Sequence, residues 1–413
     1  MPNYLLGGKP TVNPDKQPAR YATIIFMREL ARHEDQLFPF PIYRELRENT
    51  PVRFDEDRNS WDVFRYEDVH RILKDPAAFS SRRGLEVRGE TLLTMDQPKH
   101  THMRNLVNKA FTPKAINDLA PRISSITNEL LDQVIQSGKM DVVHDLATPL
   151  PVIVIAELLG VPAKDRMLFK EWSDTMVKGV EGSSDEAFAQ MVAERDKAEK
   201  ELSAYFLAIL NERRKQPEDD LVSALLQAEI DGEKLQEQEI LRFCILLLVA
   251  GNETTTNLIT NAVRLLTEQP AIQNQVRQNP ELVKTTVEET LRFYPPIVAI
   301  GRMTTQDVEI GGQLIREGQQ VVSWVGAANR DPEKFEDPDT FLPDRKPNPH
   351  MGFGFGIHFC LGAPLARLEA QIALEIMLSR MDDLSFAKTT LTPIPSPFVF
   401  GVKSYPITFS ART

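Results

Sequence analysis

Residues 353–362, FGFGIHFCLG, place one of only two cysteines in the chain, Cys360, in a glycine-rich turn. Gly354 and Gly356 allow left-handed backbone or a close approach of the chain to a flat ligand. Leucines and isoleucines at helical spacing follow in residues 361–376, so we expect Cys360 to lie near a helix N-terminus. Backbone N–H groups at such a position lower the pKa of a thiol and favour the thiolate, which binds metals. The run therefore predicts a cysteine that ligates a metal.

Other interpretations of this run remain open from its residues alone. A free cysteine is usually a small buried hydrophobic residue, and Cys244, in an apolar segment, is best interpreted in that way. Glycine-rich turns before helices also bind phosphate. No hydrophobic strand precedes this turn, however, because residues 344–350, DRKPNPH, have the composition of a loop. A lone thiolate in such a turn is what a protein needs to ligate haem iron from one side.

Composition limits the class of protein. Of the 413 residues, 42% are hydrophobic, which is enough for a large core, and the net charge of −11 argues against a nucleic-acid-binding protein. Two cysteines in unlike contexts argue against a disulfide framework and for a reducing compartment. The N-terminus lacks the pattern of a signal peptide, and the longest apolar run, residues 243–251, is too short to span a bilayer. We expect a cytoplasmic protein with no membrane span.

The pattern of apolar residues predicts a mainly α fold with a small β portion. Helical spacing before Cys360 is found in residues 66–73, 99–110, 120–134, 152–159, 185–214, 236–268 and 280–293. Residues with β preference indicate strands at 51–54, 60–64, 308–315 and 320–325. No linker, repeat or low-complexity segment divides the sequence, so we expect a single domain over residues 1–413. Its β-rich part is expected at roughly 40–65, 300–330 and the C-terminal strands.

The segment 236–268 begins apolar all round, as expected of a helix buried through the molecule, and then becomes polar at residues 251–256, GNETTT. Glycine and threonine together commonly bend or open a helix, which leaves room for a small ligand or water. A helix that has reached the surface is the alternative. Apolar residues resume after the polar run, which favours an interior polar notch centred on Glu253 and Thr254.

Glu289 and Arg292 form an ExxR pair at the end of a predicted helix. The spacing alone is weak evidence, since ion pairs at i,i+3 are common on solvated helices and the chain contains other ExxR pairs. The order of four motifs is more informative. These are AGNETT at 250–255, EETLR at 288–292, ANRDPEKFEDPDTF at 328–341 and FGFGIHFCLGAPLAR at 353–367.

This ordered set closely resembles the cytochrome P450 family of haem-thiolate monooxygenases, and the resemblance covers almost the whole chain. WDVFRYEDVHRILKDPAAFSS at 61–81 and MDQPKHTHMRNLVNKAFTP at 95–113 also look like bacterial members. The resemblance implies the cytochrome P450 fold, with a long central helix over haem and a β-rich lobe near the N-terminus. It also implies haem b as cofactor and, from members with similar motifs, oxidation of fatty acids, terpenoids or steroids.

Carried over by motif, the resemblance makes Cys360 the axial thiolate of the haem iron, with Phe353 beside the sulfur and Ala250 against the haem. Thiolate donation favours O–O cleavage in such enzymes. Glu253 and Thr254 match the family's acid and alcohol, which deliver protons during dioxygen activation. Many members have Asp where this chain has Glu253. The presence of acid and alcohol favours oxygen-driven over peroxide-driven chemistry.

The two haem propionates need cationic partners if they are buried. By motif position, the matching residues are His100, Arg104, Arg302 and His358. The resemblance gives no such role to His102 and His350, which we expect to be structural or exposed. Glu289, Arg292 and Arg345 look like the family's structural ion-pair network, which locks the region of the cysteine turn.

Family positions that line the substrate pocket are mostly apolar in this chain: Leu247, Ala250, Gly251, Thr254, Val298, Ile300, Phe398 and Val399. A hydrophobic small molecule is therefore the expected substrate, although such residues also suit an ordinary core. Arg82, Arg83 and Arg88 would suit a substrate carboxylate, but a solvated loop is the stronger interpretation.

No flavin-like or ferredoxin-like segment is found in the sequence, so we expect electrons from a separate ferredoxin or flavodoxin with an NAD(P)H-dependent reductase. Dioxygen is the expected co-substrate. Lys109 and Arg367 are expected behind Cys360, where they would meet an acidic partner. Two alternatives stay open: a peroxide-driven peroxygenase, and a non-enzymatic haem sensor or carrier, which would not need Glu253 and Thr254.

Overall fold

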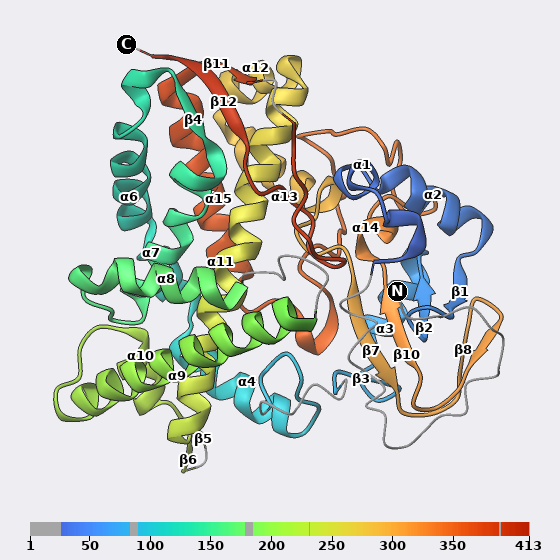
Figure 1. The fold of residues 1–413 in the computed structure, drawn as a ribbon, viewed down its shortest axis with the longest axis horizontal. Coiled ribbons are helices and arrows are strands. Elements are labelled where there is room, and N and C mark those ends of the chain that lie inside the picture. Colours follow the sequence, from blue (N-terminus) through green and yellow to red (C-terminus); the bar gives the residue numbers. More distant parts are fainter. Residues whose placement is uncertain (1–25, 83–89, 178–184, 231, 388–389, 413) are drawn as a thin grey trace.

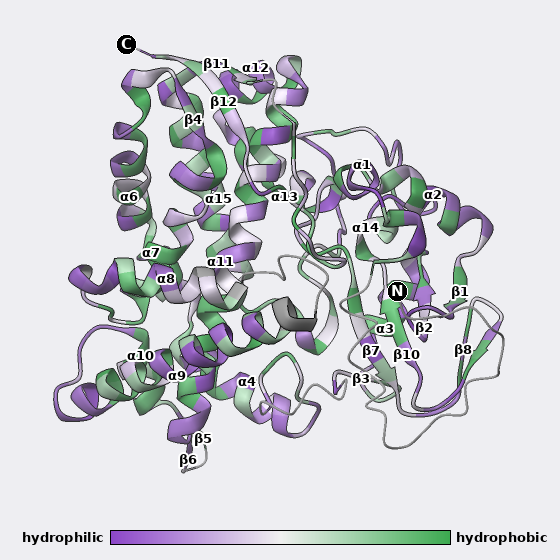
Figure 2. Cartoon of the chain, in the orientation of Figure 1, coloured by the Kyte–Doolittle hydropathy of each residue, from purple (hydrophilic) through white to green (hydrophobic). Residues whose placement is uncertain are grey.

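The computed structural model describes residues 26–82, 90–177, 185–230, 232–387 and 390–412. Most helices gather on one side of the molecule, and the main sheet lies on the other (Figure 1). Hydrophilic and hydrophobic residues alternate along most helices, as they do where a helix buries one face (Figure 2). The predicted class, mainly α with a small β portion, is confirmed.

The central element is α11 (Glu237–Glu268), which runs through the helical side of the molecule (Figure 1). It packs against α7 (Pro149–Leu158), α13 (Val283–Phe293) and α15 (Ala363–Arg380). Apolar residues all round suit this position, because several faces of the helix meet other helices. By length and composition α11 is the one described helix that qualifies as membrane-spanning, yet 61% of its apolar window is buried inside the protein. We therefore interpret α11 as the core helix of the fold.

The helices predicted from periodicity are present, with bounds that differ by a few residues. The other α-helices are α1 (His33–Leu37), α2 (Phe40–Asn49), α3 (Tyr66–Lys74), α4 (Lys99–Ala110), α5 (Pro113–Asn117), α6 (Ala120–Asp132), α8 (Arg166–Val177), α9 (Asp185–Lys215), α10 (Leu221–Gln227), α12 (Pro270–Gln278) and α14 (Val325–Ala328). Short 3₁₀ turns lie at Arg28–Leu30, Ile135–Ser137, Ala163–Asp165, Pro280–Leu282 and Gly356–His358, and a π-helix lies at Val142–Ala147.

The main sheet has the strand order β1–β2–β10–β7–β3. Its strands are β1 (Val52–Asp55), β2 (Ser60–Val63), β3 (Phe79–Ser80), β7 (Ile300–Thr304) and β10 (Gln320–Ser323). Strands β10 and β2 run parallel, with Gln320 opposite Ser60, and the other neighbours are antiparallel. The sheet thus joins the N-terminal region to a segment late in the chain.

Smaller sheets complete the fold. Strands β11 (Met381–Phe386), β12 (Pro406–Ala411) and β4 (Lys139–Asp141) form an antiparallel sheet in that order. Two hairpins are formed by β5 (Glu229–Ile230) with β6 (Glu233–Lys234), and by β8 (Val308–Ile310) with β9 (Gln313–Ile315).

One detail of the predicted β portion is wrong. Phe40–Asn49 lies in a range expected to be β-rich but forms helix α2, because its proline falls in the first turn, where a missing N–H is tolerated. The predicted β character of residues 308–315 is confirmed: they form a hairpin outside the main sheet, which turns at Gly311 and Gly312 with positive φ. The expected β-rich range 300–330 nevertheless supplies strands β7 and β10.

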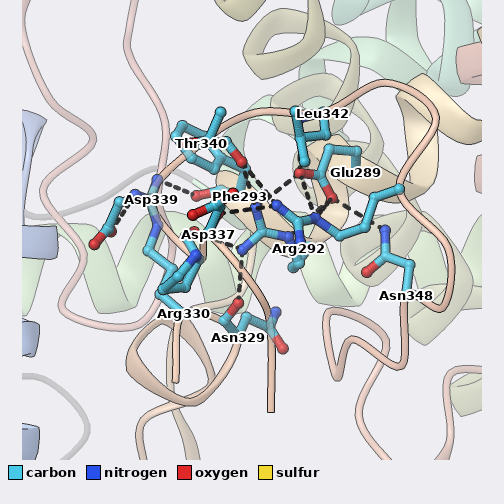
Figure 3. A network of polar contacts seen from close by, with 12 residues as sticks. Glu289, Arg292, Phe293, Asn329, Arg330, Asp337, Asp339, Thr340, Leu342 and Asn348 are labelled. Atoms are coloured by element: carbon cyan, nitrogen blue, oxygen red, sulfur yellow. Dashed lines mark hydrogen bonds and ion pairs between the residues drawn. The ribbon is translucent and has the colours of Figure 1, made fainter. Parts of the chain in front are cut away.

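A buried ion-pair network holds the segment before the cysteine turn against α13 (Figure 3). Glu289 accepts hydrogen bonds from Arg292 at 2.7 and 2.8 Å and from Arg345 at 3.0 and 3.1 Å. Both arginines also donate to backbone carbonyl oxygens within residues 329–340. The predicted network of Glu289, Arg292 and Arg345 is confirmed, and it fixes this segment relative to α13.

Candidate active site

The cysteine turn packs directly against α3. Gly354 and Gly356 have φ of +74° and +73°, in the left-handed region that favours glycine. A Cβ on Gly356 would lie 2.5 Å from the carbonyl oxygen of Leu73, so no larger residue fits there without a shift of the backbone. The backbone N–H of Cys360 donates to the carbonyl oxygen of Phe353 at 3.0 Å, which closes the turn.

The two cysteines differ in their surroundings. Cys360 is partly exposed and shortly precedes α15, whereas Cys244 is fully buried in α11. Burial raises the pKa of the Cys360 thiol, while the backbone N–H of Gly362 and the charge of Arg104 lower it. The predicted lowering effect of backbone N–H groups on this thiol is therefore present, and burial acts against it. Burial raises the pKa of Cys244 to about 12, in agreement with its interpretation as a core residue.

His100 on α4 and His358 in the cysteine turn form a pair of imidazoles whose ring centroids lie 4.2 Å apart. Neither ring nitrogen of His100 has a hydrogen-bond partner among the described residues, and the same holds for Nε2 of His358. Burial and the charge of Arg302 lower the pKa of His358 to about 3, and burial and Arg104 lower the pKa of His100. The structure thus brings together all four residues matched to the propionates.

The cations Arg104 and Arg302 and the acid Asp96 act on this pair of imidazoles. Asp96 is the acid whose charge acts on both imidazoles, but its oxygens already accept hydrogen bonds from Ser80 and Ser81. A buried polar group without a partner costs about 1–3 kcal/mol, so a bound anion with several oxygens would stabilise the cluster. The two propionates of haem have this character, and the residues present therefore fit the cofactor. Arg104 ties the cluster to the cysteine turn by donating to the carbonyl oxygen of Phe359 at 2.9 Å.

On α11, Leu247, Ala250, Gly251 and Thr254 share one helical face, because they are spaced at i, i+3, i+4 and i+7. Ala250 is exposed although it lies at the middle of a core helix, which indicates accessible space beside this turn. The hydroxyl of Thr254 donates to the carbonyl oxygen of Ala250 at 2.7 Å. Helix α11 is continuous over this turn, so the predicted opening of the helix is not observed.

Other polar residues of α11 are buried against neighbouring elements. Asn252 donates to the hydroxyl of Ser173 on α8 at 2.6 Å, and Thr256 donates to the carbonyl oxygen of Ala147 at 2.9 Å. Because these side chains are buried against α8 and the π-helix, this part of α11 lies inside the protein and not at its surface. The interior position of the notch is confirmed.

Glu253 is a partly buried acid next to this notch. Burial raises the pKa of its carboxyl group, and the positive charge of Arg195 on α9 opposes that effect. Sequence reasoning missed Arg195, because α9 carries many charged residues and no local pattern distinguishes the one that faces Glu253. A carboxyl group with a raised pKa holds its proton to a higher pH than an ordinary glutamate does.

The C-terminal part of the predicted substrate pocket is assembled from two adjacent segments. The N–H of Val298 donates to the carbonyl oxygen of Phe398 at 2.9 Å, and Ile297 forms an isolated bridge with Val399. Val298 and Val399 are buried, whereas Phe398 is 43% exposed and lies at the protein surface. Ile300 follows as the first residue of β7. The four predicted positions from these segments therefore lie close together.

Several predicted surface cations have partners in the fold. Arg82 pairs with Glu90 at 3.0 Å, while Arg83 and Arg88 lie outside the described residues. The ammonium group of Lys109 donates to the carbonyl oxygen of Glu229 at 2.6 Å and remains exposed. Arg367, expected as a docking cation, is instead half-buried in an ion pair.

The expected structural or exposed histidines also have partners. His102 is exposed and lies 3.2 Å from Glu233, and His350 is bound to Glu288 at 3.1 Å. Glu288 binds both His350 and Arg367, and nothing in the sequence indicated this beyond its place beside Glu289.

Comparison with known proteins agrees with this geometry. The family model described as cytochrome P450 matches residues 52–410. "Cytochrome P450 109" of Bacillus spizizenii is 55% identical over 390 residues, which cover 94% of this chain and 96% of that protein. The crystal structure of substrate-free CYP109E1 from Bacillus megaterium superposes with a TM-score of 0.88 at 45% identity, covering 91% of this chain and 100% of the other. The corticosterone complex of the same protein gives 0.86 at 46% identity, covering 91% and 99%.

The chain therefore belongs to the cytochrome P450 family, with the fold of that family. Its close relatives are cytochrome P450 monooxygenases, which are oxidoreductases, and this protein is an enzyme of the same class. The family binds haem through a cysteine thiolate.

Proposed function

We propose that the protein hydroxylates or epoxidises a hydrophobic small molecule of the fatty acid, terpenoid or steroid type, with dioxygen and two electrons from a separate partner. The observation that carries the proposal is the cluster of buried, unpartnered imidazoles next to Arg104 and Arg302, beside the turn that presents Cys360. A dianionic, flat cofactor would give the unpartnered imidazoles hydrogen-bond acceptors and would explain the glycine-rich turn.

In this proposal Cys360 would ligate the haem iron, and Phe353 and Ala250 would lie against the cofactor. His100, Arg104, Arg302 and His358 hold its propionates. When bound, haem supplies the activation of dioxygen and the transfer of one oxygen atom to substrate. The second oxygen atom leaves as water, which requires two electrons and two protons.

Glu253 and Thr254 are the proposed route for these protons. The raised pKa of Glu253 suits a group that accepts a proton from the α9 side and passes it on. The Thr254 hydroxyl, bonded to the carbonyl oxygen of Ala250, is held with its own oxygen free to accept a further hydrogen bond. Together they provide an acid and an alcohol in neighbouring positions on α11.

A hydrophobic substrate is supported by the residues proposed to line its pocket: Leu247, Gly251, Val298, Ile300, Phe398 and Val399. Most of these are apolar, and two segments of the wall are joined by the Val298–Phe398 hydrogen bond. The related CYP109E1 has been crystallised with corticosterone, which supports a steroid as one candidate. Arg82 is already paired with Glu90, which reduces the case for a substrate carboxylate in that loop.

The electron donor is proposed to be a ferredoxin or flavodoxin served by an NAD(P)H-dependent reductase, and the enzyme is expected in the cytoplasm, where such reductases draw on NAD(P)H. Lys109 remains a candidate contact for an acidic partner, because its side chain is exposed. We further propose that residues 1–413 form one domain, since the main sheet pairs strands from residues 52–80 with strands from residues 300–323.

The test is the spectrum of the reduced protein with carbon monoxide, followed on the same sample by titration with corticosterone, a terpenoid and a long-chain fatty acid. A thiolate-type Soret band that is lost in Cys360→Ser is expected, and at least one compound should shift the haem spectrum and be oxidised when dioxygen, a ferredoxin and its reductase are supplied. Absence of the band in the wild-type protein would refute the proposal. A normal band without any substrate shift would refute the substrate class alone.

A further inference from the structure

Arg367 lies on α15 and forms a bidentate ion pair with Glu288 on α13. Its Nε donates to Oε1 of Glu288 at 2.7 Å, and its Nη2 donates to Oε2 at 2.9 Å. Both side chains are half-buried. Two parallel N–H···O bonds of this kind fix the orientation of the guanidinium plane, which a single charge contact would not do.

His350 completes the cluster from the chain just before the cysteine turn. Its Nδ1 accepts a hydrogen bond from the backbone N–H of Gly352 at 3.1 Å, so in the neutral ring the proton is on Nε2. Nε2 lies 3.1 Å from Oε2 of Glu288 and can donate to it. We call Glu288, His350 and Arg367 the Glu288 cluster. It links α13, α15 and the backbone that leads into the turn.

The Glu288 cluster reaches Cys360 through Phe353. The guanidinium carbon of Arg367 lies 4.6 Å from the centroid of the Phe353 ring, at a distance suited to a cation–π contact. The carbonyl oxygen of Phe353 in turn accepts the backbone N–H of Cys360 at 3.0 Å. The charge of Arg367 also acts on the thiol of Cys360 and favours its thiolate form.

The charges of Glu288 and Arg367 in the Glu288 cluster nearly cancel. Burial raises the pKa of Glu288, but hydrogen bonds from His350 and Arg367 lower it to about 2, so this carboxyl group is ionised at neutral pH. Its negative charge offsets the positive charge of Arg367. The neighbouring Glu289 serves the other network and contacts Arg292 and Arg345. The adjacent acids Glu288 and Glu289 on α13 therefore bind different partners.

We propose that Glu288 and Arg367 are positioning residues that fix Phe353 beside the sulfur of Cys360 and balance the charge there, and that they thereby set the reduction potential of the bound haem. The inference rests on the proposed function, in which Cys360 ligates the iron. A cation near a thiolate weakens its donation and favours the reduced iron, whereas an unbalanced anion has the opposite effect.

Two single variants should shift the potential in opposite directions. Arg367→Met removes the cation and leaves the anion of Glu288 unbalanced, so the potential should become more negative. Glu288→Gln leaves the cation of Arg367 unbalanced, so the potential should become more positive. The double variant removes both charges and should return towards the wild-type value. Arg367→Lys keeps the charge but loses the planar fork, and its potential should stay closer to wild type than that of Arg367→Met.

The measurement is a spectroelectrochemical titration of each purified holoprotein, with the reduced carbon monoxide spectrum as a check of thiolate ligation. Glu157→Gln is the control, because Glu157 pairs with Arg122 and Arg166 on α6 and α8 and should leave the potential unchanged. Opposite shifts with intact thiolate spectra support the inference. Shifts of the same sign, or unchanged potentials, would overturn it.

The proposed function and the role of the Glu288 cluster fail on different results. If the wild-type protein shows no thiolate-type band, the proposed function fails. If the wild-type band is normal but the charge variants do not separate in potential, only the role of the Glu288 cluster fails. If Glu288→Gln does not retain haem, the comparison of Arg367→Met with Arg367→Lys still tests the inference. Equal shifts in the potential of these two variants would show that the charge of Arg367 does not set the potential.

Discussion

Glu369 is a fully buried carboxyl group on α15, and its Oε1 has no hydrogen-bond partner among the described residues. Burial raises its pKa to about 8. The folded protein therefore keeps a proton that the unfolded chain has already lost above about pH 4.5, the ordinary value for Glu. Because the unfolded state then binds fewer protons, the stability of the wild type should fall as pH rises towards 8 and stay low above it.

Glu369→Gln removes this titration. Its free energy of unfolding, relative to wild type, should rise between pH 5 and 8 by at most roughly 4 kcal/mol, since one proton changes it by at most about 1.4 kcal/mol per pH unit. Chemical unfolding of both proteins at several pH values measures the difference. Glu375→Gln, at an exposed position of the same helix, is the control. A difference that does not change with pH would contradict the prediction.

Thr254→Ala should separate electron consumption from product formation. Without the hydroxyl, proton delivery during dioxygen activation is impaired, so the variant should consume NAD(P)H but release mainly hydrogen peroxide. Thr127→Ala is a matched control, because Thr127 makes the same hydrogen bond one turn back, to Ile123, on α6. Product and peroxide per NAD(P)H are measured with the redox partners present. Unchanged coupling in Thr254→Ala would contradict the proposed role, and a haem sensor would show no turnover to lose.

At the scale of secondary-structure elements, the cysteine turn depends on its contact with α3. Gly356→Ala should destabilise the protein and weaken haem retention, because the new Cβ meets the carbonyl oxygen of Leu73 and φ is +73°. Gly318→Ala has a similar φ of +76° and nothing within 4 Å of the new Cβ. This control should lose about 1–2 kcal/mol from backbone strain alone.

The difference between the two glycine variants isolates the contact between the turn and α3. Thermal unfolding and the carbon monoxide difference absorbance per mole of protein measure stability and haem retention. Equal behaviour of Gly356→Ala and Gly318→Ala would show that the close approach to Leu73 is unimportant.

Elements with clear periodicity could be predicted from the sequence, and α11 and α4 agree closely with their predicted ranges. Helix α2 could not, because the run FPFPIY has the composition of a turn or strand, and the prolines are tolerated only through their place at the helix start. At the site, the motif residues could be predicted by resemblance. Arg195 and Glu288 could not, since their partners are distant in sequence and depend on how whole helices pack.

At the scale of the molecule, the Glu289 network joins α13 to the segment that leads to the cysteine turn. Glu289→Gln leaves Arg292 and Arg345 buried without a counter-charge, so it should destabilise the protein by about 3–5 kcal/mol. Asp57→Asn breaks the exposed pair with Arg28 and should leave stability nearly unchanged. Denaturant unfolding with bound haem measures both. A small loss in Glu289→Gln would mean that packing, and not charge, holds this segment.

The strand order β1–β2–β10–β7–β3 also governs how the chain folds while it is made. Strands β1 and β2 leave the ribosome early and can form their hairpin, but the inner edge of β2 has no partner until β10 has been synthesised. The sheet of β11, β12 and β4 can be completed only later, because its central strand β12 ends at Ala411. During translation this enzyme therefore carries an unpaired strand edge until residues 320–323 have been made, and such an edge can pair with other chains and aggregate.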